Sequence, residues 1–172
     1  LNTFIAECNK EGNLNIQLLE DAGNTFNRLL NRAMGLGSAP SVIACIGPQD
    51  DSLDERIGYY GEKIVVYAQQ LGLNTCWAGT YNKKNVTAKI DAGERLAIVI
   101  AIGYGVNKGK PRKSKTVAQV IQGIESDMPE WFINGARMAL LAPTAVNQQK
   151  FELALKGDSY EVIDKGGILS KI

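Results

Sequence analysis

The sequence predicts an α+β fold in which helices pack against a mixed central sheet in layers. Three observations support this prediction. Residues 52–71 carry apolar side chains at helical spacing, residues 96–102 form a continuous apolar run typical of a buried central strand, and helices and strands are mixed without a regular βαβ repeat. The chain has 172 residues, enough for one domain to bury most of its apolar surface, so we expect residues 1–172 to form a single domain.

The first part of the chain is predicted to contain a strand, a helix and a second strand. In residues 13–20, apolar side chains recur at every second position, which indicates a strand with one apolar face. Residues 24–33 place apolar side chains at helical spacing, and glycine and proline interrupt the segment that follows. Residues 41–46 form a short apolar run rich in β-branched side chains and are predicted to be a strand.

A long helix is predicted next. Ser52 and Glu55 match a capping box, in which the serine side chain caps the helix and the glutamate reaches back to the serine amide. The helical apolar pattern continues to Leu71, and Gly72 is expected to end the helix. The apolar surface is broad, as in a helix that is buried on more than one side. The short segment at residues 75–80 leads to the central strand at residues 96–102.

The last part of the chain is predicted to form a helix and a β-hairpin. Asp127 is expected to start the helix and Pro143 to end it. The residues expected on its inner face are Trp131, Gly135, Met138, Ala139 and Ala142. Residues 151–155 and 160–163 are predicted to pair around Gly157-Asp158.

The composition excludes several classes of chemistry. The chain contains no histidine, so Ser-His-Asp triads, Cys-His nucleophile pairs and histidine-ligated zinc sites are impossible. The three cysteines are widely spaced, which favours reduced thiols in the cytoplasm over a disulfide framework. The net charge of +1 indicates no general attraction to nucleic acid or membranes, and no apolar run is long enough to span a bilayer. We expect a cytoplasmic protein that takes its chemistry from a cofactor, without metal ligands or catalytic side chains of its own.

Two glycine-containing segments are candidates for ligand contact. Residues 71–80 (L-G-L-N-T-C-W-A-G-T) end in a small pair that would let a flat ligand approach the backbone, although, taken alone, a helix end followed by a strand explains them better. Residues 103–111 (G-Y-G-V-N-K-G-K-P) match neither the dinucleotide fingerprint nor the P-loop, because the third glycine and the Ser/Thr are missing.

Two polar segments are also candidates. The basic loop at residues 108–115 could hold one phosphate between Lys113 and Lys115, could be a solvated loop, or could contact nucleic acid. Residues 142–151 (A-P-T-A-V-N-Q-Q-K-F) gather hydroxyl and amide groups on a turn fixed by proline. These groups could reach a polar ring edge or bond to their own backbone.

Taken together and in this order, these segments resemble the nitroreductase family of FMN enzymes. Residues 142–151 resemble the family motif A-P-S-x-x-N-x-Q-P-W, with Lys150-Phe151 in place of Pro-Trp. Residues 71–80 resemble the family's L-G-L-x-x-x-W-x-G turn beside flavin N5. The strand that ends at Gly103-Tyr104, followed by Lys-Ser-Lys, resembles the strand and basic pair that bind the FMN phosphate. The resemblance covers residues 41–151.

This resemblance implies the fold, the cofactor and the contacts. It implies a nitroreductase-like layered fold with a long buried central helix, and a flavin that takes hydride from NAD(P)H at N5 and passes it to a nitroaromatic, a quinone or a similar acceptor. The implied partner is therefore a small-molecule substrate, with no nucleic acid and no membrane. The implied cofactor-binding residues are Ala78, Gly79, Arg112, Lys113, Lys115, Thr144, Ala145 and Asn147.

The order of the motifs differs from that of ordinary family members, because the A-P-S-x-x-N-like segment follows the phosphate loop. This order resembles a nitroreductase subgroup in which one chain carries two related halves, so we expect a monomer that imitates the family dimer, or a homodimer. The family's N-terminal Arg-Arg-Ser-x-Arg segment has no counterpart, and we expect that the chain lacks this segment and its C-terminal end. Two alternatives stay open: a flavin-binding paralogue without turnover, and a small nucleic-acid-binding module that uses the basic loop.

Overall fold

The computed structural model describes residues 1–22, 24–26, 41–105, 107, 109 and 111–166. The chain divides into two compact units, residues 1–108 (unit 1) and residues 109–172 (unit 2), and each has a hydrophobic core of its own. Within the described residues, no helix is both long and apolar enough to cross a membrane. The α+β class is confirmed, and a single domain over residues 1–172 stays a prediction.

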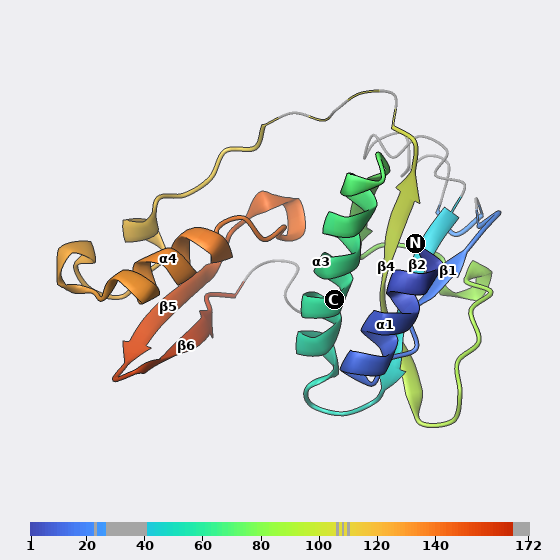
Figure 1. The fold of residues 1–172 in the computed structure, drawn as a ribbon, viewed down its shortest axis with the longest axis horizontal. Helices are drawn as coiled ribbons and strands as arrows, with labels where there is room; N and C mark the ends of the chain where they lie inside the picture. The colour runs from blue at the N-terminus through green and yellow to red at the C-terminus, as the bar shows by residue number, and fades with distance from the viewer. Residues whose placement is uncertain (23, 27–40, 106, 108, 110, 167–172) are drawn as a thin grey trace. The chain divides into compact units, whose positions relative to one another are not determined.

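Unit 1 is built on a sheet of four described strands, shown in Figure 1. These strands are β1 (Gln17–Leu19), β2 (Ser41–Pro48), β3 (Asn74–Ala78) and β4 (Glu94–Gly103), in the spatial order β1-β2-β4-β3. The predicted strands at residues 41–46 and 96–102 are confirmed, and β4 is central, as its continuous apolar run indicates. The described pairs in this sheet are all antiparallel, whereas the sequence predicts a mixed sheet.

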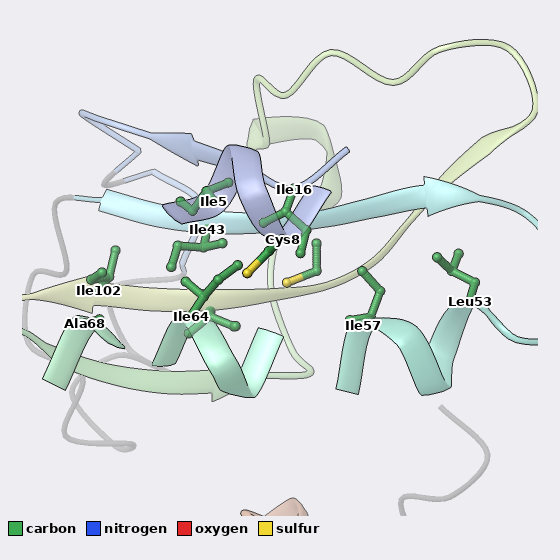
Figure 2. Packing of buried hydrophobic residues seen from close by; sticks show 11 residues of the cluster. Ile5, Cys8, Ile16, Ile43, Leu53, Ile57, Ile64, Ala68 and Ile102 are labelled. Atoms are coloured by element: carbon green, nitrogen blue, oxygen red, sulfur yellow. The ribbon is translucent and has the colours of Figure 1, made fainter. Parts of the chain in front are cut away.

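Two helices cover one face of the sheet. Helix α1 (Asn2–Gly12) and helix α3 (Leu53–Gln70) pack their apolar sides on β2 and β4, and Figure 2 shows the side chains that meet between them. The fully or nearly fully buried members are Ile5, Cys8, Ile16, Ile43, Cys45, Leu53, Ile57, Ile64, Ala68, Ile100 and Ile102. The predicted helix at residues 52–71 is therefore confirmed as α3, but burial on more than one side is not, since Tyr59 is 63% exposed and Val66 is 52% exposed. Helix α1 was not predicted from the sequence.

The opposite face of the sheet has a second cluster. Here Val42, Val99 and Ala101 alternate with the residues of the first cluster, because successive side chains of a strand point to opposite faces. Phe26 packs on this face, and the short 3₁₀ helix η1 (Lys83–Asn85) belongs to the loop between β3 and β4. Of the helix predicted at residues 24–33, residues 24–26 form a turn and bend, and residues 27–33 lie outside the described part of the chain.

The start of α3 corrects the predicted capping box. Ser52 occupies the N-cap position, but its side chain makes no capping hydrogen bond. The Ser52 hydroxyl instead donates to Asp50 Oδ1 at 2.9 Å, and both terminal nitrogens of Arg56 donate to the Asp50 carboxylate. A bidentate guanidinium–carboxylate pair is stronger than the neutral hydroxyl–amide bond of a capping box. Asp50 therefore organises the helix start, and Glu55 does not.

Unit 2 combines one α-helix with a hairpin among its described residues. Helix α4 (Glu130–Ala139) precedes β5 (Phe151–Lys156) and β6 (Ser159–Asp164), which pair in the predicted hairpin around Gly157, whose φ is +65°. The 3₁₀ helices are η2 (Val117–Gln119), η3 (Glu125–Asp127) and η4 (Ala145–Asn147). On the other side of β5, Leu153 exchanges backbone hydrogen bonds with Val120 and Gln122.

Helix α4 faces its core differently from the prediction. It begins at Glu130 rather than at Asp127, and the side chains it buries are Phe132, Ile133 and Ala136. The predicted inner face is wrong, since Trp131 is 46% exposed and Met138 is 62% exposed. Both faces of this short helix carry apolar residues, so the spacing alone could not identify the buried one.

Candidate cofactor-binding site

The basic loop and the turn at residues 144–149 come together in unit 2. They are about 30 residues apart in the sequence, and a single side chain, that of Gln149, bonds to both. Gln149 is only 4% exposed. Its Oε1 accepts from the Lys115 amide at 2.8 Å, and its Nε2 donates to the Lys113 carbonyl and to Asn147 Oδ1, each at 3.0 Å.

The turn itself is held in an unusual backbone conformation. Val146, Asn147 and Gln149 all have positive φ values, of 44°, 56° and 49°. Such values are strained for side-chain-bearing residues, above all for a β-branched valine, and they persist only where surrounding contacts fix them. Here the Thr144 hydroxyl accepts from the Gln149 amide at 3.0 Å, and the Thr144 carbonyl accepts from the Asn147 amide at 2.9 Å.

The three predicted phosphate ligands have different surroundings. The guanidinium of Arg112 donates to the carbonyls of Leu140 and Ala142, and thus satisfies the end of α4, where helix carbonyls lack partners. The ammonium of Lys115 donates to the Gln149 carbonyl at 2.6 Å. Lys113 is exposed, and among the described residues its ammonium has no acidic partner. Lys113 is therefore the cation best placed to take an external anion.

The nearby carboxylate of Glu152 is kept ionised. Hydrogen bonds from Gln122 and Lys165 lower the pKa of Glu152, and the positive charge of Lys115 lowers it further. The Lys115 ammonium thus donates a hydrogen bond to the Gln149 carbonyl and also attracts the Glu152 carboxylate electrostatically. Of the two lysines, Lys113 is therefore the one whose positive charge has no such neighbour among the described residues.

The other two candidates, Ala78 and Gly79, belong to unit 1. Ala78 ends β3, is fully buried and pairs with Val99 of the central strand. Gly79 follows it on the surface, and a Cβ built there would meet nothing within 4 Å. Gly79 has no positive φ, so the backbone conformation does not require glycine there. Because no described atom of unit 1 covers this position, a ligand could approach its backbone.

The surroundings of β3 hold this turn in place. The Trp77 indole nitrogen donates to Glu62 of α3 at 2.9 Å, and the Trp77 ring lies against Gly61. Burial raises the pKa of the Cys76 thiol, so Cys76 stays a neutral thiol at neutral pH. Cys76 is therefore no thiolate nucleophile.

Unit 2 also contains a cavity of about 400 Å³ that the sequence does not reveal. It lies between α4 and the hairpin, and its walls are almost entirely apolar, with the Thr144 hydroxyl among the few polar groups. The lining residues are Trp131, Phe132, Gly135, Ala136, Ala139, Ala142, Thr144, Phe151, Leu153, Tyr160 and Val162. Four of the five residues predicted for the inner face of the helix thus line this cavity instead of a closed core.

Comparison with known proteins identifies the family. The family model described as "Putative TM nitroreductase" matches residues 1–172. The chain belongs to this family. This match confirms the resemblance to the nitroreductase family that the motifs indicated. No curated protein matches it in sequence.

Two solved structures of nitroreductase proteins, with TM-scores of 0.59 and 0.50, share the fold of this chain. A "putative nitroreductase" from Thermotoga maritima has a TM-score of 0.59 and 19% identity, over 88% of this chain and 58% of its own length. A "putative NADH dehydrogenase/NAD(P)H nitroreductase" from Parabacteroides distasonis has a TM-score of 0.50 and 14% identity, over 70% of this chain and 84% of its own. For an FMN-dependent nitroreductase from Clostridium difficile the values are 0.46 and 17%, over 74% and 83%. This chain therefore spans 58% of the length of the Thermotoga maritima protein.

The role of each predicted contact stays a prediction, but the geometry groups the residues. Arg112, Lys113, Lys115, Thr144, Ala145 and Asn147 belong to unit 2, where the Gln149 network connects the two segments that carry them. Ala78 and Gly79 belong to unit 1. The sequence analysis missed Gln149 as a connecting residue. The signal that could have pointed to it is the glutamine of the turn motif, because an amide side chain can donate and accept hydrogen bonds at once.

Proposed function

We propose that this nitroreductase-family chain is part of an FMN-dependent oxidoreductase that takes hydride from NAD(P)H and reduces a nitroaromatic, a quinone or a similar small acceptor. The observation that carries the proposal is the Gln149 network in unit 2. It brings an exposed lysine loop against a turn of hydroxyl and amide groups, and FMN requires both kinds of contact.

The residues present fit this cofactor. Lys113 offers an ammonium that has no acidic partner among the described residues. The exposed Ser114 and the half-buried Lys115 beside it could complete a phosphate site. Thr144, Ala145 and Asn147 would orient the polar edge of the ring or the ribityl chain.

In unit 1, we also propose the backbone of Ala78 and Gly79 as a flavin contact, because a Cβ built at Gly79 would meet nothing within 4 Å. When bound, FMN would supply the acceptance and onward transfer of hydride, and the chain would supply orientation and charge.

The proposal extends to the setting of the protein. Cys8, Cys45 and Cys76 are all free, as expected in the reducing cytoplasm. We therefore propose a cytoplasmic enzyme with a small-molecule acceptor.

A flavin titration tests the proposal. Adding FMN to the purified protein should quench flavin fluorescence on binding, and the complex should oxidise NADH or NADPH when a nitroaromatic or a quinone is supplied. Failure to bind FMN at a large excess would overturn the proposal. Binding without NAD(P)H oxidation would identify a flavin-binding paralogue without turnover. Salt-sensitive binding of single-stranded nucleic acid in place of flavin would indicate the nucleic-acid module.

A further inference from the structure

We propose that Gln149 is a positioning residue, which acts through Lys113 and Lys115 to set the affinity for the phosphate of the cofactor. This inference rests on the proposed function, since it assigns a role within the FMN site. Gln149 itself is only 4% exposed and bonds to Lys113 and Lys115, so we infer that it acts through the lysines.

The hydrogen bonds of Gln149 hold both lysines by their backbone. Its side-chain nitrogen donates to the Lys113 carbonyl at 3.0 Å, and its side-chain oxygen accepts from the Lys115 amide at 2.8 Å. Its own carbonyl accepts from the Lys115 ammonium at 2.6 Å. Three bonds therefore join one residue to the segment 113–115, which belongs to no described helix or strand.

The same side chain also connects the loop to the turn at residues 144–149, which carries the proposed contacts to the ring. Its Nε2 also donates to Asn147 Oδ1 at 3.0 Å, and Asn147 Nδ2 donates to the Lys113 carbonyl at 2.8 Å. The Lys113 carbonyl thus accepts from two amides, which fixes its backbone while its side chain stays exposed. The Lys113 ammonium is thereby held at a defined position relative to the turn, where it can bind an anion.

Glutamine suits this position better than any other residue type. The site needs a donor and an acceptor at the end of the same buried side chain, and an amide offers both. A glutamate would lose the donor, and an asparagine would be one methylene too short. Burying the amide is tolerated because both of its polar atoms are bonded, as buried polar groups require.

The test compares FMN with riboflavin, which differ only in the phosphate. In Gln149→Met the side chain keeps its length but loses its hydrogen bonds, and the Kd for FMN should rise about tenfold, more than the Kd for riboflavin. Gln148→Met is the matched control, because Gln148 is adjacent and, among the described residues, its side chain bonds only to the Ala145 carbonyl. This control should keep the wild-type preference for FMN.

A second variant and a backbone measurement guard against misfolding. Gln149→Asn keeps an amide but cannot reach both lysines, and it should lower the FMN preference in the same direction. Hydrogen exchange of the Lys115 amide should accelerate in both Gln149 variants, since its acceptor is lost or displaced.

Each outcome decides a different point. If both flavins weaken equally in the Gln149 variants, Gln149 supports the unit as a whole and the positioning role is wrong. If the wild-type protein prefers FMN and the variants keep that preference, the role is also wrong, while the proposed function stands. If the wild-type protein binds neither flavin, the proposed function fails and this inference fails with it.

Discussion

The basic residues of segment 112–115 show how the immediate surroundings of a side chain decide what it can bind. The donors of Arg112 are used by the carbonyls at the end of α4, and the ammonium of Lys115 is bonded to Gln149. The ammonium of Lys113 has no acidic partner among the described residues. Because a charge-assisted contact requires an available donor, Lys113 should contribute most to anion binding and least to the stability of the unit.

At this scale we predict that Lys113→Ala weakens FMN binding about tenfold, a loss that corresponds to one charge-assisted hydrogen bond on an exposed group. The free energy of unfolding should change by less than about 0.5 kcal/mol, because the side chain makes no bond within the described part of the chain. Lys10→Ala, at an exposed position in α1, is the control. Fluorescence titration of both variants gives the result, and equal Kd values would show that Lys113 is only solvated.

Two contacts of helix α3 show what fixes an element in place. Its N-terminal end is organised by the Asp50–Arg56 pair, and its middle approaches β3 closely at Gly61. A Cβ on Gly61 would lie 2.5 Å from Trp77 Cη2, which is closer than van der Waals contact allows. The helix can pack against β3 at this distance because glycine has no side chain.

We predict that Asp50→Asn destabilises the protein near neutral pH more than Glu55→Ala does. Hydrogen bonds from Arg56 and Ser52 lower the pKa of Asp50 from 3.8 to about 2. A lowered pKa means that the stabilisation is complete above pH 3.8 and disappears as the pH falls through about 2. Urea unfolding at several pH values should therefore show the wild-type and Asp50→Asn curves converging at low pH. A larger effect of Glu55→Ala than of Asp50→Asn would instead support the capping box predicted from the sequence.

For the middle of α3 we predict opposite effects at two glycines. Gly61→Ala should lower the free energy of unfolding by about 1–3 kcal/mol, because the added methyl overpacks against the Trp77 ring. Gly58→Ala should raise it by about 0.5–1 kcal/mol, since nothing lies within 4 Å of its Cβ and alanine favours helices. Thermal unfolding of the two variants measures both effects. Stabilisation by Gly61→Ala would mean that Trp77 moves aside freely.

At the scale of the whole molecule, each unit has a separate hydrophobic core. In unit 1, buried side chains lie on both faces of the sheet, and in unit 2 Phe132, Ile133 and Ala136 of α4 pack on Leu153 of the hairpin. A core side chain should therefore matter first to its own unit. Hydrogen exchange can resolve this, because it reports local stability along the chain.

We predict that Phe132→Ala destabilises unit 2 by about 3–5 kcal/mol, since a buried aromatic ring is lost and a cavity remains. Met138→Ala, in the same helix but 62% exposed, should change stability by less than about 0.5 kcal/mol. Exchange in Phe132→Ala should accelerate in residues 111–166 before residues 41–105. Equal acceleration in both ranges would show that the two cores unfold as one.

The sequence by itself predicted the family and most of the elements, and its composition excluded several kinds of chemistry. The apolar periodicities at residues 41–46, 52–71, 96–102 and 151–163 depend on near neighbours, so they predict strands, a helix and a hairpin that the structure confirms. The absence of histidine excluded whole classes of catalysis, and the order of four motifs led to the nitroreductase family. The helix α1 was missed because its buried residues are too few to form a clear pattern.

Only the tertiary structure decided which face of α4 is buried, which group caps α4 and which residue joins the phosphate loop to the turn. Apolar side chains lie on both faces of α4, so burial depends on where the hairpin packs. Arg112 finds its acceptors 28 and 30 residues away, and Gln149 finds the lysine backbone 34 and 36 residues away. Hydrogen bonds at such separations leave no local pattern in the sequence, because the partners meet only when the chain has folded.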